Sequence, residues 1–171
     1  AELQTESGHY AEAIAAFDEI VARLGDQGDG CLEQVMLARY NRAVLLRDSG
    51  SPDAAAAYRG VADEGSTSSS DAVRRFAALA TYNLGVLQLR RGDQAAALET
   101  FERMPCHFDT TSDPVVRLRL AKAMYFGAEL LVGSGLQVAL DAFAKVVERF
   151  EGDDDENLRR IVSGARRRLR L

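Results

Sequence analysis

Few residues in this chain have the types and spacing that catalysis requires. The two histidines, His9 and His107, lie far apart in the sequence, and each falls at an expected turn or loop position. No Ser, His and Asp arrangement indicates a nucleophile, and neither the G-x-x-x-x-G-K-[ST] nor the G-x-G-x-x-G phosphate loop occurs. The sequence therefore predicts no catalytic site and no cofactor.

Metal chemistry is equally poorly supported. Cys31 and Cys106 are the only cysteines, and their wide separation fits neither a zinc site nor a disulfide framework, so we expect free thiols in a reducing cytoplasm. The acidic runs at 25–30 and 151–156 lack the loop with a closing glutamate that calcium requires. Both runs precede an expected helix, so we interpret their acids as helix caps, and no metal site is predicted.

The tail from residue 154 to 171 is polarised. It begins with acids and ends with basic residues, namely Arg166, Arg167, Arg168 and Arg170. This order complements the helix macrodipole at both ends. One interpretation is a capping helix whose arginines keep an open end solvated. The other is a docking site for an acidic protein, a nucleic acid or a lipid.

A Tyr-Asn pair occurs twice, as Tyr40-Asn41 and Tyr82-Asn83. Asparagine carries both a donor and an acceptor, so it can bridge a peptide's backbone amide without reading side chains. The same pair could instead serve packing and a hydrogen bond between repeats. The residues alone do not decide between these two interpretations.

The amino-acid composition indicates which kind of secondary structure must position these residues. Hydrophobic residues make up 47% of the 171-residue chain, and Ala, Leu, Arg and Glu abound, which favours helices. The net charge of -5 argues against a nucleic-acid partner. No apolar run approaches the ~18 residues of a membrane span. Because the first residue is Ala1 rather than Met, the chain is compatible with being a segment of a longer protein.

The sequence matches itself at a shift of about 42 residues, which indicates a repeat architecture. Four columns recur, and we assign each a mechanical role. The aspartates are expected to cap the first helix of each unit, the glycines to end it, the alanines to allow close approach in the second helix, and the aromatics to fill the space between units. The columns are Asp29, Asp71, Asp113 and Asp155; Gly8, Gly50 and Gly92, with Ser134; Ala13, Ala55, Ala97 and Ala139; and Phe17, Phe101 and Phe143, with Tyr58 offset by one residue.

These columns predict a single repeat domain over residues 1–171, with units at about 1–24, 29–64, 71–108 and 113–151 and a capping helix at 154–171. The expected helices are 1–7 with 10–24, 30–49 with 52–64, 71–91 with 94–104, and 113–132 with 136–151. The break near Gly8 and the early end at Met104-Pro105 follow from the chemistry of glycine and proline. We therefore expect an all-α solenoid of antiparallel helix pairs.

Residues 82–104 resemble a tetratricopeptide repeat. The family signature has L-G in the first helix and A-x-x-x-F in the second, here Leu84-Gly85 and Ala97 with Phe101. The period of about 42 exceeds the usual 34 and is similar to the longer repeats of kinesin light chains and many bacterial arrays. The resemblance implies a right-handed superhelix of about 3.5 repeats with a concave groove lined by the first helices.

In such proteins the groove binds an extended peptide or a helix of a partner protein. Mapped onto this chain, the groove-facing positions are Tyr40, Asn41, Val44 and Arg47, then Tyr82, Asn83, Val86 and Leu89, then Met124, Tyr125, Ala128 and Leu131. A clamp for a C-terminal carboxylate is not expected, because Leu37, Ala121 and Tyr125 stand where basic residues would be needed.

The resulting hypothesis is a non-catalytic, cytoplasmic scaffold for protein–protein interaction, with no membrane partner. Two alternatives stay open. The first is a self-assembly module, because Ile14, Phe17 and Val21 near the N-terminal end need a cover that a second copy could supply. The second is a sensor or regulatory domain of a larger enzyme or transcription regulator, whose active part lies outside these residues.

Overall fold

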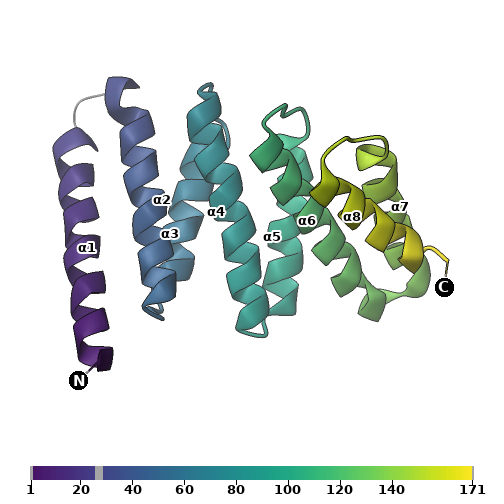
Figure 1. Ribbon diagram of the computed structural model, residues 1–171, viewed down its shortest axis with the longest axis horizontal. Helices are drawn as coiled ribbons and strands as arrows, with labels where there is room; N and C mark the ends of the chain where they lie inside the picture. Colours follow the sequence, from purple (N-terminus) through teal and green to yellow (C-terminus); the bar gives the residue numbers. More distant parts are fainter. Residues whose placement is uncertain (1, 26–28, 171) are drawn as a thin grey trace. The chain divides into compact units, whose positions relative to one another are not determined.

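A computed structural model describes residues 2–25 and 29–170, and in that part of the chain every regular element is a helix (Figure 1). The all-α prediction is confirmed. The chain forms two compact units, Ala1–Leu87 and Gln88–Leu171, which are described separately below. The helices are α1 (Glu2–Leu24), α2 (Leu32–Asp48), α3 (Ala54–Gly65), α4 (Asp71–Arg90), α5 (Gln94–Phe108), α6 (Pro114–Leu131), α7 (Leu136–Phe150) and α8 (Glu156–Arg168), with short 3-10 turns at Asp29–Cys31 and Val132–Ser134.

The first unit contains α1, α2, α3 and most of α4. Helix α2 packs against both α1 and α3, and Figure 1 shows α2 between α1 and α4. One apolar cluster joins α2, α3 and α4 through Met36, Tyr58 and Val73, none of which is more than 1% exposed. The Ile14 side chain of α1 packs against the same cluster.

The second unit contains the last residues of α4 with α5, α6, α7 and α8. Helix α6 packs against α5 and α7, and α8 packs against both α6 and α7. The alanine and aromatic columns lie in this core: Ala97, Phe101, Ala139 and Phe143 are each at most 1% exposed. Their burial confirms that small residues let paired helices approach while aromatic rings fill the space between them.

Glycine ends two first helices, as the repeat columns predicted. Gly50 follows α2 with φ +73°, and Gly92 follows α4 with φ +81°. Around Gly50, its own N–H donates to the Arg47 carbonyl at 3.0 Å, and the Ser51 N–H donates to the Leu46 carbonyl at 2.8 Å. The equivalent pair of bonds surrounds Gly92. This is the Schellman motif, which satisfies the last carbonyls of a helix.

The predicted aspartate caps are confirmed at two of the four positions. The carboxylate of Asp113 accepts from the backbone N–H groups of Val115 and Val116, and that of Asp155 caps α8 in the same way. At α4 the prediction is wrong: Asp71 is already helical, and the Ser70 hydroxyl accepts from the Val73 N–H. Helix α2 begins at Leu32 after the 3-10 turn, and the Asp29 side chain lies outside the described residues.

Two expected helix ends are also wrong. Helix α1 runs without a break through Gly8. Gly50 and Gly92 are followed by Ser51-Pro52 and by Asp93, which are favoured at the start of another helix, whereas Gly8 is followed by His9 and Tyr10, which are not. A glycine inside a helix costs only about 1 kcal/mol, so the helix continues.

Helix α5 likewise passes through Pro105 and ends at Phe108. The backbone hydrogen bond that proline cannot donate is offset by burial on both sides of it, because Met104 and Phe108 are at most 1% exposed.

In the described residues no helix is both long and apolar enough to cross a membrane.

Candidate functional site

The predicted groove residues lie on three helices. Tyr40, Asn41, Val44 and Arg47 are on α2, Tyr82, Asn83, Val86 and Leu89 on α4, and Met124, Tyr125, Ala128 and Leu131 on α6. Tyr82 and Ala128 are buried, and the other ten are half-buried. The positions from Tyr40 to Val86 belong to the first unit, and Leu89 and the four positions on α6 belong to the second.

Within the first unit, α2 and α4 meet through a polar and aromatic cluster. The Tyr40 ring stacks on Phe76 of α4 with 6.1 Å between ring centroids, and lies 6.3 Å from the ring of Tyr58 in α3. The Asn83 side-chain amide donates to the Tyr40 hydroxyl at 3.1 Å. Asn83 therefore makes the hydrogen bond between repeats that the packing interpretation predicts.

Asn41 has a different environment from Asn83, although both occupy the same repeat position. Its carboxamide is half-buried and makes no hydrogen bond to any residue that the structure describes. The donor and the acceptor of this amide are therefore both available to a ligand. Val44, one turn later on α2, is half-buried and supplies apolar surface beside it.

The Tyr58 hydroxyl lies beneath this cluster. The side chain is fully buried, and the hydroxyl has no hydrogen-bond partner among the described residues. Asn83 lies near it as well, but the hydrogen bond that Asn83 makes is to Tyr40. Burial raises the pKa of Tyr58 to about 12, against the opposing effect of the nearby Arg47 guanidinium. Nothing in the sequence pattern marks this hydroxyl, because Tyr58 reads only as the offset aromatic of its column.

In the second unit, Met124 and Tyr125 have different surroundings. Met124 lines an apolar hollow of about 490 Å3 between α5, α6 and α7, together with Leu98, Phe101, Gly127 and others. The rings of Tyr125 and Phe143 pack edge to face with 5.4 Å between their centroids, and Tyr125 lies against α8 at Gly164. A hollow among α1, α2 and α3 of the first unit is smaller, at about 280 Å3. That one is bordered by two ion pairs, Asp18–Arg42 and Arg39–Glu64.

The tail arginines do not form the single group that the sequence suggested. Arg168 binds Glu129 of α6 through two parallel hydrogen bonds, each 2.8 Å long. Arg166 pairs with Glu151 at the end of α7. Arg167 and Arg170 have no ion partner among the described residues. Half of the predicted group therefore ties α8 to its own unit, as a capping helix would require.

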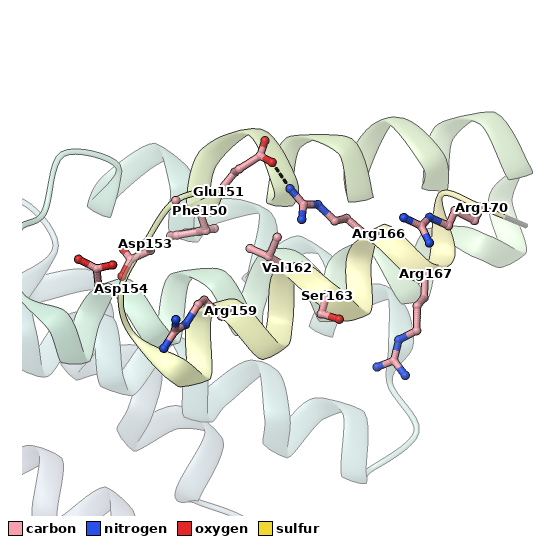
Figure 2. Close-up of a pocket in the computed structure, with 11 residues that line it drawn as sticks. Phe150, Glu151, Asp153, Asp154, Arg159, Val162, Ser163, Arg166, Arg167 and Arg170 are labelled. Atoms are coloured by element: carbon pink, nitrogen blue, oxygen red, sulfur yellow. Dashed lines mark hydrogen bonds and ion pairs between the residues drawn. The ribbon is translucent and has the colours of Figure 1, made fainter.

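A polar hollow of about 480 Å3 lies where α7 turns into α8 (Figure 2). Arg166, Arg167 and Arg170 line it with Arg159 and Ser163 of α8, and its acidic lining residues are Glu151, Asp153 and Asp154. Arg117 of α6 holds Asp153 at 2.6 Å. The backbone N–H of Asp155, and after it Arg117, lower the pKa of that carboxyl. Sequence reasoning missed Arg159 and Ser163, whose i, i+4 spacing along α8 was the available signal.

No arrangement of groups in the described part of the chain suggests a metal centre. Among the side chains that the structure describes, those of residues 9–25 and 30–170, no three of His, Cys, Asp or Glu converge as metal ligands would. The acidic run at 151–156 is used instead in turns and caps, because Asp153 accepts from the Asp155 N–H and Asp155 caps α8.

Comparison with known proteins gives one family. The model of the tetratricopeptide repeat family matches residues 1–69 and 70–110, which is more than half of the chain. Searches of curated proteins and of solved structures gave no match.

Proposed function

This chain belongs to the tetratricopeptide repeat family, a class of non-catalytic protein-interaction scaffold, and we propose that it binds an extended peptide or helix of a partner protein along its first helices. The proposed contact surface in the first unit is the α2–α4 surface, formed by Tyr40, Asn41, Val44, Arg47, Asn83 and Val86. No residue of this surface has a catalytic role in the proposal.

The Asn41 carboxamide, which has no hydrogen-bond partner among the described residues, is the observation that supports this proposal best. An amide that is half-buried without a partner loses part of its hydration and gains no internal bond in exchange. A peptide backbone laid along α2 supplies both a carbonyl and an N–H, which this amide can bind at once. The half-buried Val44 and Val86 offer apolar contacts for alternate side chains of an extended peptide.

The two asparagines allow a test that separates binding from folding. Peptides would be selected by phage display on the immobilised protein, and their affinity measured by calorimetry. Asn41→Ala should weaken binding by roughly two- to tenfold, the equivalent of one net hydrogen bond, and leave the melting temperature unchanged. Selected peptides that bind Asn41→Ala as tightly as the natural sequence would contradict the proposed surface.

Asn83→Ala is the matched control. It removes the hydrogen bond to Tyr40, so it should lower the melting temperature. If both variants lose stability equally and neither loses affinity beyond that, the asparagines serve packing alone.

Self-association through α1 is a second candidate. Ile14 of the predicted face packs against the core of its own unit, but Ile20 on this helix is 38% exposed, and Phe17 and Val21 are only half-buried. An apolar helix face of this kind favours contact with a second copy. Sedimentation equilibrium over a wide concentration range should show association that Ile20→Glu abolishes, whereas a monomer at all concentrations would eliminate this candidate.

A further inference from the structure

Helix α8 has one buried face and one basic face. Leu158, Val162 and Ala165 are buried against the second unit. The neighbouring face presents exposed side chains at i, i+4, i+7 and i+11, with one further arginine beside them. We call this face the basic stripe, and its members are Arg159, Ser163, Arg166 and Arg167 of α8 and Arg170 in the turn that follows it.

The two other arginines of α8 are already neutralised by acids of the same chain. Arg160 pairs with Glu156 at 2.6 Å, and Arg168 with Glu129 at 2.8 Å. Within the basic stripe, only Arg166 has such a partner, Glu151. Arg159, Arg167 and Arg170 have no acidic partner among the described residues. Three uncompensated guanidinium groups therefore lie on one helix face of a chain whose net charge is -5.

The basic stripe also lies beside a hollow in the surface. It borders the hollow of about 480 Å3 in Figure 2, which is lined as well by Phe150 and Val162. The stripe extends over about 12 Å of α8, from Arg159 to Arg167 at ~1.5 Å per residue, and continues to Arg170 in the turn after the helix. Ser163 is the only small side chain in it, so another backbone can approach most closely there.

We propose that the basic stripe binds an acidic helical segment of a partner protein, laid alongside α8. Carboxylates at i, i+4, i+7 and i+11 of such a helix match the spacing of the stripe, and guanidinium groups bind carboxylates through paired hydrogen bonds. Glu151 and Asp154 border the same hollow, and a chain with a negative charge at every unit, such as a polyphosphate backbone, places charges against them, whereas a helix that carries carboxylates only at the stripe spacing does not. The observations therefore favour an acidic peptide over a nucleic acid. This surface is distinct from the α2–α4 surface and does not depend on it.

The test uses the full 171-residue chain and fluorescence anisotropy. The probe is a labelled helical peptide of about twelve residues with glutamates at i, i+4, i+7 and i+11. We expect binding that weakens steeply as salt is raised, because exposed charge pairs are screened. The triple change Arg159→Gln, Arg167→Gln and Arg170→Gln should weaken it by about ten- to a hundredfold, since several charge-assisted contacts are lost.

The matched control removes three exposed arginines elsewhere, at Arg23, Arg59 and Arg90, and so makes the same change in net charge. This control variant should bind the probe nearly as well as the natural sequence. Equal losses in the two triple variants would show general electrostatic attraction and overturn the proposal. A scrambled peptide of the same composition that binds equally well would overturn the helical match.

Ser163→Glu provides a variant in which every arginine is kept. Its carboxylate would lie in the middle of the stripe, on an exposed surface, and should abolish binding without loss of helix content by circular dichroism. Unchanged binding in this variant would overturn the proposal. A single-stranded oligonucleotide that binds more tightly than the acidic peptide would assign the stripe to nucleic acid instead and would overturn it as well.

Discussion

Tyr40 and Tyr125 occupy first helices of two repeats, α2 and α6, and each is covered by the first helix of the next repeat, α4 and α8 respectively. The two contacts differ in chemistry. Tyr40 of α2 is stacked on Phe76 and accepts a hydrogen bond from Asn83, both neutral groups of α4. Tyr125 of α6 lies against Gly164 of α8, and the same two helices are joined by the bidentate Arg168–Glu129 ion pair. The first contact is aromatic and neutral, whereas the second combines a glycine with charge.

The difference shows that the repeat fixes the helix packing but not its chemistry. In the first unit Gly65 of α3 lies against buried side chains and the Val73 carbonyl, whereas in the second unit Gly164 of α8 lies against the half-buried Tyr125 ring. A neutral buried contact is insensitive to salt, and an exposed ion pair is screened by it. Raising the salt concentration should therefore weaken the contact between α8 and α6 but leave the α2–α4 contact unchanged.

The largest expected effect is at Gly65, where α3 meets α2 and α4. A Cβ at this position would lie 2.9 Å from the Ala77 Cβ and 3.1 Å from the Val73 carbonyl oxygen, neither of which can move independently of α4. Gly65→Ala should therefore lower the free energy of unfolding by roughly 1–3 kcal/mol, measured by urea denaturation.

Two further glycine substitutions serve as controls for the loss expected at Gly65. Gly60 lies on the same helix with nothing within 4 Å of an added Cβ, so Gly60→Ala should stabilise by about 0.5–1 kcal/mol. At Gly164 the added Cβ would meet only the Tyr125 ring, at 3.2 Å, and that ring can shift. A loss at Gly164→Ala as large as that at Gly65→Ala would contradict the contrast between the two contacts.

The next effect is at the neutral contact between α2 and α4. Tyr40→Phe keeps the stacking on Phe76 but removes the acceptor for Asn83, and should cost about 0.5–1.5 kcal/mol. The loss should be the same at low and high salt. In a double-mutant cycle with Asn83→Ala, additive losses would mean that the two groups do not interact, against the geometry seen here.

A smaller effect is expected at the charged contact. Glu129→Gln removes the bidentate bond to Arg168, whose guanidinium is exposed to solvent. We expect faster amide hydrogen exchange in α8 at low salt and no difference from the natural sequence at about 1 M salt. Exchange that is equally fast at both salt concentrations would show that the pair does not act through its charge.

Residue spacing predicted the parts of this molecule that depend on local chemistry. The glycines after α2 and α4 and the caps at Asp113 and Asp155 follow from their immediate neighbours. The continuous α1 and the extension of α5 past Pro105 were not predicted, because neighbouring residues and burial outweighed the glycine and the proline.

The candidate sites depend on contacts through space, and the columns could not supply these. Asn41 and Asn83 read identically in sequence, yet only one of them meets a tyrosine from another helix. In the same way, the tail arginines look equivalent in the sequence but have different surroundings. Arg168 binds Glu129 of α6 and so is not available to a ligand. Spacing shows which residues are equivalent in the repeat, but not which of them find a partner.

The smallest effect at neutral pH is expected at Tyr58 beneath the α2–α4 surface, whose buried hydroxyl has no hydrogen-bond partner in the part of the chain that the structure describes. Tyr58→Phe removes an unsatisfied polar group without creating a cavity, so stability should stay the same or rise by up to about 1 kcal/mol.

Burial raises the pKa of Tyr58 to about 12 from the usual 10.0, so the folded state favours the neutral phenol. The stability that this shift contributes is fully present below pH 10 and is lost as the pH rises from 10 to 12. Natural protein should therefore lose up to about 2 kcal/mol more than Tyr58→Phe over this range, measured as the difference between their melting curves. Parallel curves would mean that the hydroxyl is hydrated in the folded state, and a loss of stability in Tyr58→Phe at neutral pH would mean that it has a hydrogen-bond partner after all.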